Sequence, residues 1–318
     1  MNARTRGVQA ALASSVFLGL IPVFGKQAIL LGVAPLALAA VRTALAAGMM
    51  AGGVLLFRRK YLYIYPAGLV GCLFAGGING LGSLLYYSAL GRIDAGLGQL
   101  LFALYPLFVM VWSGLERKKP GKVSLLRLVL GILAIGMLVL PGAQRLDRGA
   151  VAMMLGSSLL YALHMPINQR VLYDMPAATV TLYTLLGMNA VVGPAYLVSR
   201  TLVSVDPSLG WLPAAGWGSI LAVTLATFGS RLALFFGVKR LGGAQAALLG
   251  LGEMLVAVLF SHLWLGESLN SLQWAGASLI AASLALVWLE RSGKDDPRPA
   301  PSQRLPNYPW TSLPPSNR

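Results

Sequence analysis

The sequence predicts an all-α integral membrane protein, with ten transmembrane helices arranged as two inverted five-helix repeats. Three observations predict this class. Hydrophobic residues make up 57% of the 318 residues and charged residues 11%, against roughly 45–50% and 25% in soluble domains. The apolar residues form runs long enough to cross a bilayer, and the second half of the chain echoes the first. This composition excludes a disordered chain, a disulfide scaffold and most soluble enzymes.

Each predicted span is an apolar run of about 20 residues, the length that a helix needs to cross the hydrocarbon core. Charge clusters and Gly/Pro turns separate the runs. A membrane β-barrel is excluded, because its strands are about 10 residues long and alternate in polarity. The ten segments are 8–31, 35–57, 66–88, 94–115, 123–141, 149–168, 176–199, 213–237, 242–263 and 270–290.

The basic residues predict the orientation. When the spans alternate across the membrane, 18 of the 25 Lys and Arg residues fall on the side of the N-terminus and four on the other. Cytoplasmic loops carry such an excess, so we expect both termini in the cytoplasm and the chain in the inner or plasma membrane. The net charge of +15 therefore reports orientation and not a nucleic-acid partner. Residues 292–318 hold seven prolines and are predicted to be a disordered cytoplasmic tail.

Features of the first half recur in the second. Ser14-Ser15 opens one apolar run, and Ser157-Ser158 opens another 143 residues later. The stretch from Tyr86 to Arg92 has a counterpart from Leu234 to Arg240, offset by 148 residues. Each half holds five predicted helices. Because five passes end on the opposite side of the membrane, the second copy starts there and is inverted relative to the first. Inverted repeats are an architecture of secondary transporters, with the substrate site near the midplane. The predicted repeats are 1–145 and 146–291.

Ionisable residues inside the spans are candidate functional groups, because a charge at membrane depth is costly. Glu253 lies halfway along the ninth span. It is interpreted either as a cavity group that binds substrate or takes a proton, or as a structural acid bonded to a facing helix. Arg231 in the eighth span is expected to face the cavity, and two arrangements are considered for it: a pair with Glu253, or extension toward the cytoplasmic interface. Arg42 and Lys26 are interpreted as structural intramembrane charges.

Uncharged polar side chains recur at helical spacing within the spans. Asn79 and Ser83 lie one turn apart in the third span, and the repeat offset aligns them with Thr227 and Arg231. Symmetry-related polar faces of this kind are expected to line a central cavity, although each residue alone is more often an interhelical hydrogen bond. The remaining cavity candidates are Tyr86, Gln99, Tyr105, His164 and Asn168.

The sequence contains no motif for binding a metal or a cofactor. Cys72 is the single cysteine, and the two histidines, His164 and His262, are nearly 100 residues apart. No His, Cys and carboxylate cluster has metal-ligand spacing, and no P-loop or dinucleotide fingerprint is present. We therefore predict no cofactor, no metal and no catalytic residue.

Several local motifs occur together in this chain, and their combination is typical of one family of membrane proteins. The sequence resembles the drug/metabolite transporter superfamily, in its ten-helix form with two EamA-type domains. Three positions depart from the family pattern: Met254 replaces a proline, Leu18-Gly19-Leu20 replaces a stretch with tryptophan, and an acid is displaced to Glu116. The matching motifs are Ala34-Pro35, Ala40-Val41-Arg42, Tyr87-Ser88-Ala89-Leu90, Tyr105-Pro106, Leu251-Gly252-Glu253, Leu265-Gly266-Glu267-Ser268 and Gln273-Trp274-Ala275-Gly276.

The resemblance implies a secondary transporter, not an enzyme. Such a protein moves a small metabolite, here an amino acid or a related polar or cationic solute, by alternating access through a cavity between the repeats. Export is the direction that the resemblance implies. Proton coupling follows if Glu253 titrates, and facilitated transport follows if it does not. The expected partners are the solute, the bilayer and protons, with the chain as a monomer or homodimer. Two alternatives stay open: a non-transporting membrane subunit or sensor, and a membrane-embedded lipid-modifying enzyme.

Overall fold

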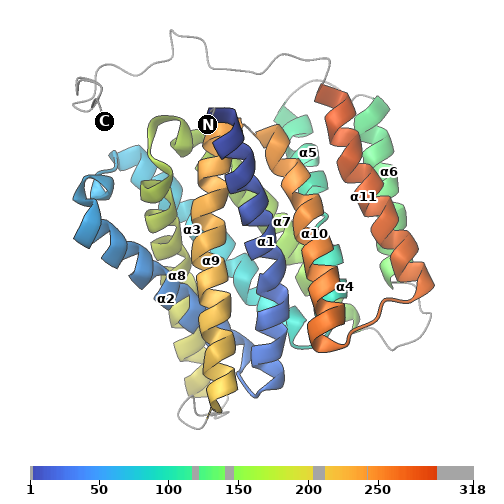
Figure 1. Ribbon diagram of the computed structural model, residues 1–318, viewed down its shortest axis with the longest axis horizontal. Helices are drawn as coiled ribbons and strands as arrows, with labels where there is room; N and C mark the ends of the chain where they lie inside the picture. The colour runs from blue at the N-terminus through green and yellow to red at the C-terminus, as the bar shows by residue number, and fades with distance from the viewer. Residues whose placement is uncertain (1–2, 117–121, 140–146, 203–211, 242, 292–318) are drawn as a thin grey trace.

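The computed structural model describes residues 3–116, 122–139, 147–202, 212–241 and 243–291, and the secondary structure of this part of the chain is all helical (Figure 1). A short 3₁₀ turn, Arg59–Leu62, follows the second helix. The predicted tail, 292–318, lies outside the described residues. The helices are α1 (Ala3–Leu30), α2 (Pro35–Phe57), α3 (Pro66–Leu90), α4 (Ala95–Phe102), α5 (Tyr105–Glu116), α6 (Lys122–Val139), α7 (Arg148–Asp174), α8 (Ala177–Leu202), α9 (Ala214–Leu241), α10 (Gly243–Leu265) and α11 (Ser271–Arg291).

Each of the ten predicted spans overlaps helix within the described residues, which leave out 140, 141 and 242. Among the described residues, six helices are long and apolar enough to cross a membrane, namely α1, α2, α3, α7, α8 and α9. Shorter apolar helical stretches cover 95–109, 125–139, 252–265 and 271–286. Figure 1 shows the start of α1 and the end of α11 at the same end of the bundle, as an even number of passes requires.

Local chemistry sets several of the helix starts. Pro35 and Pro66 occupy the first positions of α2 and α3, where the missing N–H has no helical partner to lose. Asp147 caps α7, because its carboxylate accepts the N–H groups of Gly149 at 2.8 Å and Ala150 at 3.2 Å. The bond from the Ala150 N–H is the main cause that lowers the pKa of Asp147.

The fourth predicted span is not one continuous helix, so the expectation of a single helix over 94–115 is corrected. α4 ends at Phe102 and α5 begins at Tyr105. The cause is Pro106, which has no N–H to donate to the Phe102 carbonyl one turn earlier. The hydroxyl of Ser158, from α7, donates to that carbonyl at 2.9 Å instead. The break is therefore held open by a neighbouring helix.

Replacing Ser158 with Ala is expected to lower the free energy of unfolding by about 1–3 kcal/mol, because the buried Phe102 carbonyl is left without a donor. Unfolding of the purified protein in detergent measures this loss. Ser278→Ala is the control, since the exposed Ser278 hydroxyl bonds only to Trp274 in its own helix. Equal unfolding temperatures for the two variants would contradict the account of the break.

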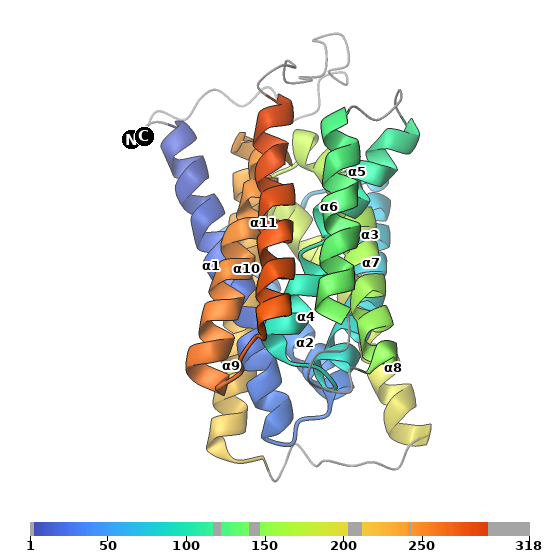
Figure 2. The same ribbon diagram turned by 90° about the vertical axis from the view of Figure 1, so that its right-hand side faces the viewer.

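The helices pack as a central group with a pair at one side. α1 packs against α9 and α10, α3 packs against α7 and α8, and α2 contacts α8 and α9. α6 and α11 pack together at one edge of the molecule and stand side by side in both views (Figure 1, Figure 2). Many outward side chains are large, apolar and exposed, such as Val70 and Leu263, as expected for a surface that faces lipid.

Glycines allow the closest helix contacts. A Cβ atom added at Gly76 of α3 would meet the Thr184 carbonyl oxygen and would lie 2.9 Å from the Gly187 Cα of α8. A Cβ atom at Gly19 of α1 would lie 2.6 Å from the carbonyl oxygen of Glu253 in α10. Small residues let membrane helices approach in this way. The second contact brings α1 directly against the segment that carries Glu253.

Candidate functional site

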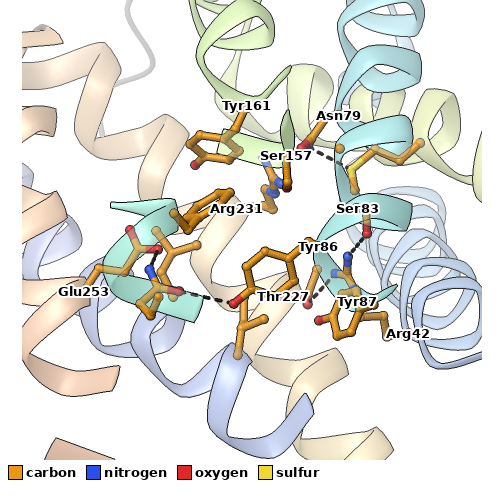
Figure 3. Close-up of a pocket in the computed structure, with 16 residues that line it drawn as sticks. Arg42, Asn79, Ser83, Tyr86, Tyr87, Ser157, Tyr161, Thr227, Arg231 and Glu253 are labelled. Carbon is orange, nitrogen blue, oxygen red and sulfur yellow. Dashed lines mark hydrogen bonds between the residues drawn. The ribbon is translucent and has the colours of Figure 1, made fainter. Parts of the chain in front are cut away.

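A cavity of about 60 Å³ lies inside the central helices and is lined from both halves of the chain (Figure 3). This volume holds a few water molecules and is small beside the roughly 300–1,000 Å³ of pockets for drug-sized ligands. Arginine, carboxylate, amide and hydroxyl groups share its wall with aromatic rings. The lining residues are Leu18, Ile21, Arg42, Asn79, Gly82, Ser83, Tyr86, Tyr87, Gln99, Phe102, Ser157, Tyr161, Met188, Thr227, Arg231 and Glu253.

Most of the sequence-predicted candidates meet in this cavity. Arg42, interpreted from the sequence as a structural charge, lies on the cavity wall. Tyr105, His164 and Asn168 do not line it; Tyr105 and His164 pack against lining residues, and the Asn168 side-chain oxygen accepts a hydrogen bond from Thr184 at 3.0 Å. The predicted candidates that line the cavity are Asn79, Ser83, Tyr86, Gln99, Thr227, Arg231 and Glu253.

The Glu253 carboxylate is held by an amide from the broken helix. Gln99 Nε2 of α4 donates to Glu253 Oε1 at 2.6 Å, and the Tyr86 hydroxyl donates to Gln99 Oε1 at 3.2 Å. Among the described residues, no ion pair joins Arg231 to Glu253, so the expected pairing is wrong. Glu253 is instead the end of a hydrogen-bonded chain that starts at Tyr86 (Figure 3).

Arg231 is buried and held by neutral partners. When the Asn79 amide is turned so that its oxygen faces these donors, the oxygen accepts from the two terminal guanidinium nitrogens of Arg231, at 2.6 and 3.1 Å. His164 Nε2 lies 3.3 Å from Arg231 Nη1, and His164 Nδ1 lies 2.6 Å from the Tyr161 carbonyl oxygen. Because a guanidinium only donates, Nε2 is the acceptor, Nδ1 carries the hydrogen, and the imidazole is neutral. Arg231 therefore does not extend to the interface, which was the other expectation for it.

Arg42 reaches the cavity from α2 and is also held by neutral groups. Its guanidinium donates to Thr227 Oγ1 at 3.0 Å and to Ser83 Oγ at 2.5 Å. The Tyr87 ring lies under it, with the guanidinium carbon 4.6 Å from the ring centroid. The hydroxyls of Ser83 and Thr227, from α3 and α9, thus hold the same arginine.

Aromatic rings form the remaining wall. Phe102 packs edge to face against Tyr86 and Tyr161, with centroids 5.2 and 5.1 Å apart, and Tyr105 packs against Tyr161 at 4.9 Å. Sequence reasoning missed Tyr161, Tyr87 and Phe102 as cavity residues. For Tyr161 a signal exists, since it lies one turn from both Ser157 and His164 on the same helix face.

Lys26 lies outside the cavity, at one end of the bundle. Its Nζ donates to the carbonyls of Leu90 and Ile93, both at 2.9 Å, and so binds the end of α3 to α1. Nearby, the Glu267 carboxylate accepts the N–H groups of Ala95 at 2.8 Å and Gly96 at 2.9 Å, at the start of α4. Burial raises the pKa of Glu267 above its ordinary value, against the lowering effect of these N–H bonds. Both contacts tie loop ends together on this face.

A small polar cavity with buried charges, enclosed by membrane-length helices and adjoining a broken helix, is the arrangement of a membrane transporter. The model of the EamA-like transporter family matches residues 5–140 and again residues 148–289. This chain belongs to the EamA-like transporter family. It is a multi-pass membrane protein, and its family indicates a transporter rather than an enzyme.

Comparisons with individual proteins agree with this family. An uncharacterized transporter of Archaeoglobus fulgidus is 26% identical over 206 residues, 64% of this chain and 71% of that protein. An uncharacterized transporter of Synechocystis is 29% identical, over 62% of this chain and 64% of its own length. The uncharacterized inner membrane transporter YedA of Escherichia coli K12 is 25% identical, over 80% of this chain and 82% of its own. A crystal structure with 17% identity covers 91% of this chain and 98% of its own, with a TM-score of 0.62, which shows a shared fold.

Proposed function

We propose that this chain is a secondary transporter that moves a small polar metabolite through the central cavity by alternating access. The observation that carries the proposal is the cavity itself: three buried charged residues, Arg42, Arg231 and Glu253, converge there from α2, α9 and α10. Charged groups at membrane depth mark substrate or ion pathways. We propose that the chain acts as a monomer or homodimer in the inner or plasma membrane.

Helix packing supports two repeats, 1–145 and 146–291, that are inverted relative to each other. When α7 is taken as the counterpart of α1, and α9 as that of α3, the contact of α1 with α9 matches the contact of α7 with α3. Likewise, α1 contacts α10 while α7 contacts α5, and the pairs α2–α8 and α6–α11 join counterparts. An approximate two-fold axis produces this exchange of partners.

The contacts of Lys26 and Glu267 support a closed gate on one face. They join the end of α1, the α3–α4 connection and the α10–α11 connection. Trp264 adds a bond from its indole N–H to Gln27 of α1, at 2.9 Å. With both termini in the cytoplasm, this face is the outer one, and export would require these contacts to open.

Reconstitution tests the transport proposal directly. The purified full chain is placed in proteoliposomes loaded with unlabelled solute, and uptake of labelled monocarboxylates, amino acids and cationic dyes is followed. For at least one solute, we expect labelled uptake well above the uptake into protein-free liposomes. This uptake should require the same unlabelled solute inside the proteoliposomes. If no solute of the panel exchanges, the transport proposal fails.

A further inference from the structure

We propose that the cavity binds the carboxylate of a small organic anion between Arg42 and Arg231, and that a net negative charge is a condition for binding. The inference rests on the proposed function and names the substrate class for that same cavity. Both guanidinium groups line the one cavity, from α2 and α9 (Figure 3).

The cavity wall carries an excess of positive charge. Its charged side chains are Arg42, Arg231 and Glu253, which are 5%, 7% and 3% exposed. Arginine stays protonated in proteins, so the wall is positive by one charge with Glu253 ionised and by two with Glu253 protonated. A buried charge without a counter-charge is costly. An anion in the cavity removes this imbalance, whereas a cation increases it.

Neither arginine has an anionic partner among the described residues. The groups that hold them are the neutral side chains of Ser83, Thr227, Asn79 and His164. These partners fix the direction of each guanidinium and leave its charge unbalanced. Arg42 Nε is buried and has no hydrogen-bond acceptor in the described part of the chain. The planar fork of donors matches a carboxylate, which accepts two parallel N–H bonds.

Glu253 is not placed as the partner of an ammonium group. Its carboxylate already accepts from Gln99 at 2.6 Å, and Gln99 is bonded in turn to Tyr86. A cationic or zwitterionic solute that reaches the carboxylate also brings its ammonium group into a cavity with two arginines, whose charge repels it. The aromatic wall of Phe102 and Tyr161 suits the apolar part of a small anion. The wall therefore favours a monocarboxylate over a zwitterionic amino acid and over a cation.

The experiment compares four compounds of equal size and different charge on the purified full chain in detergent at pH 7. They are L-lactate (anion), L-lactamide (neutral), L-alanine (zwitterion) and L-alaninamide (cation), with sodium chloride to equalise ionic strength. Affinity is measured by the rise in unfolding temperature with concentration. The expected result is that lactate binds at least about tenfold more tightly than lactamide, as a charge-assisted pair predicts. Equal stabilisation by lactate and lactamide, or stabilisation by none of the four, overturns the inference.

Two variants locate the effect. Arg42→Gln and Arg231→Gln are each expected to reduce lactate affinity to the level of lactamide, whereas Arg170→Gln, at an exposed position of α7, leaves it unchanged. If a variant does not fold, the wild-type comparison of lactate with lactamide still decides the matter. Binding in detergent does not require transport, so the two proposals fail separately. Lactate binding without flux in proteoliposomes overturns transport alone, and flux of a cation without lactate binding overturns the anion site alone.

Discussion

Replacing Glu253 with Gln is expected to abolish uptake driven by a pH gradient and to leave solute exchange at equilibrium intact. Within the described spans, Glu253 is the acid that lines the cavity, and it lies 3% exposed between α1 and α4. Glutamine keeps the size of the side chain and an oxygen that accepts from Gln99, but it carries no exchangeable acid proton. We therefore expect gradient-driven accumulation to be lost, because intramembrane acids of this kind form the proton relays of transporters.

The measurement compares accumulation with and without a pH gradient in proteoliposomes that hold equal amounts of each protein. Glu267→Gln is the matched control, because Glu267 is also a partly buried carboxylate but lies outside the cavity, at the start of α4. In the Glu267→Gln variant, the ratio of accumulation driven by the pH gradient to exchange without a gradient is expected to equal that of the wild type. An unchanged pH dependence in Glu253→Gln would remove Glu253 from the coupling role.

Replacing Gly76 with Ala is expected to destabilise the whole fold, because α3 and α8 cross in backbone contact at this residue. A Cβ atom there would meet the Thr184 carbonyl oxygen and would lie 2.9 Å from the Met188 nitrogen. Backbone atoms of a packed helix cannot turn aside as a side chain can. We expect a loss of about 1–3 kcal/mol in the free energy of unfolding, the usual cost of overpacking.

The neighbouring residue supplies the control for this prediction. At Gly77 an added Cβ atom would lie 3.7 Å from the Val191 side chain, which is ordinary contact. Gly77→Ala is therefore expected to be neutral or slightly stabilising, since alanine favours helix over glycine by up to about 1 kcal/mol. Unfolding temperatures in detergent compare the two variants. A similar effect at both positions would show that helix propensity, and not the α3–α8 contact, decides the outcome.

The all-helical membrane class and the positions of the helices were predictable from the sequence, and six of the helices in the described residues are long and apolar enough to span. The bilayer interior allows only long apolar segments with satisfied backbone groups, so each of the ten predicted segments overlaps helix in the described residues. The interruption at 103–104 was not predicted, although Pro106 carried the signal for it. The free-energy cost of the interruption depends on whether another helix supplies a donor to the Phe102 carbonyl. Here that donor is Ser158, which is 56 residues from Phe102 in the chain. No local pattern contains that information.

The partners of the buried charges were predicted less well. Glu253 and Arg231 were recognised as unusual because each is a charge inside an apolar run, but their expected pairing is not formed. The sequence places both residues at a depth in the membrane without giving the side of the helix that each one faces. Arg42 shows the same limit: its cavity position follows from Ser83 and Thr227, which belong to α3 and α9.

By itself, therefore, the sequence determined that this chain is a membrane protein, where its helices lie, and which charged residues are out of place in a bilayer. Only the tertiary structure decided which of those residues share a cavity. The physical reason is that lipid-facing and protein-facing sides of these helices are both apolar. A soluble helix reveals its buried face by alternating polarity, whereas here the facing side is set by small residues such as Gly19 and Gly76 and by hydrogen bonds between helices far apart in the chain.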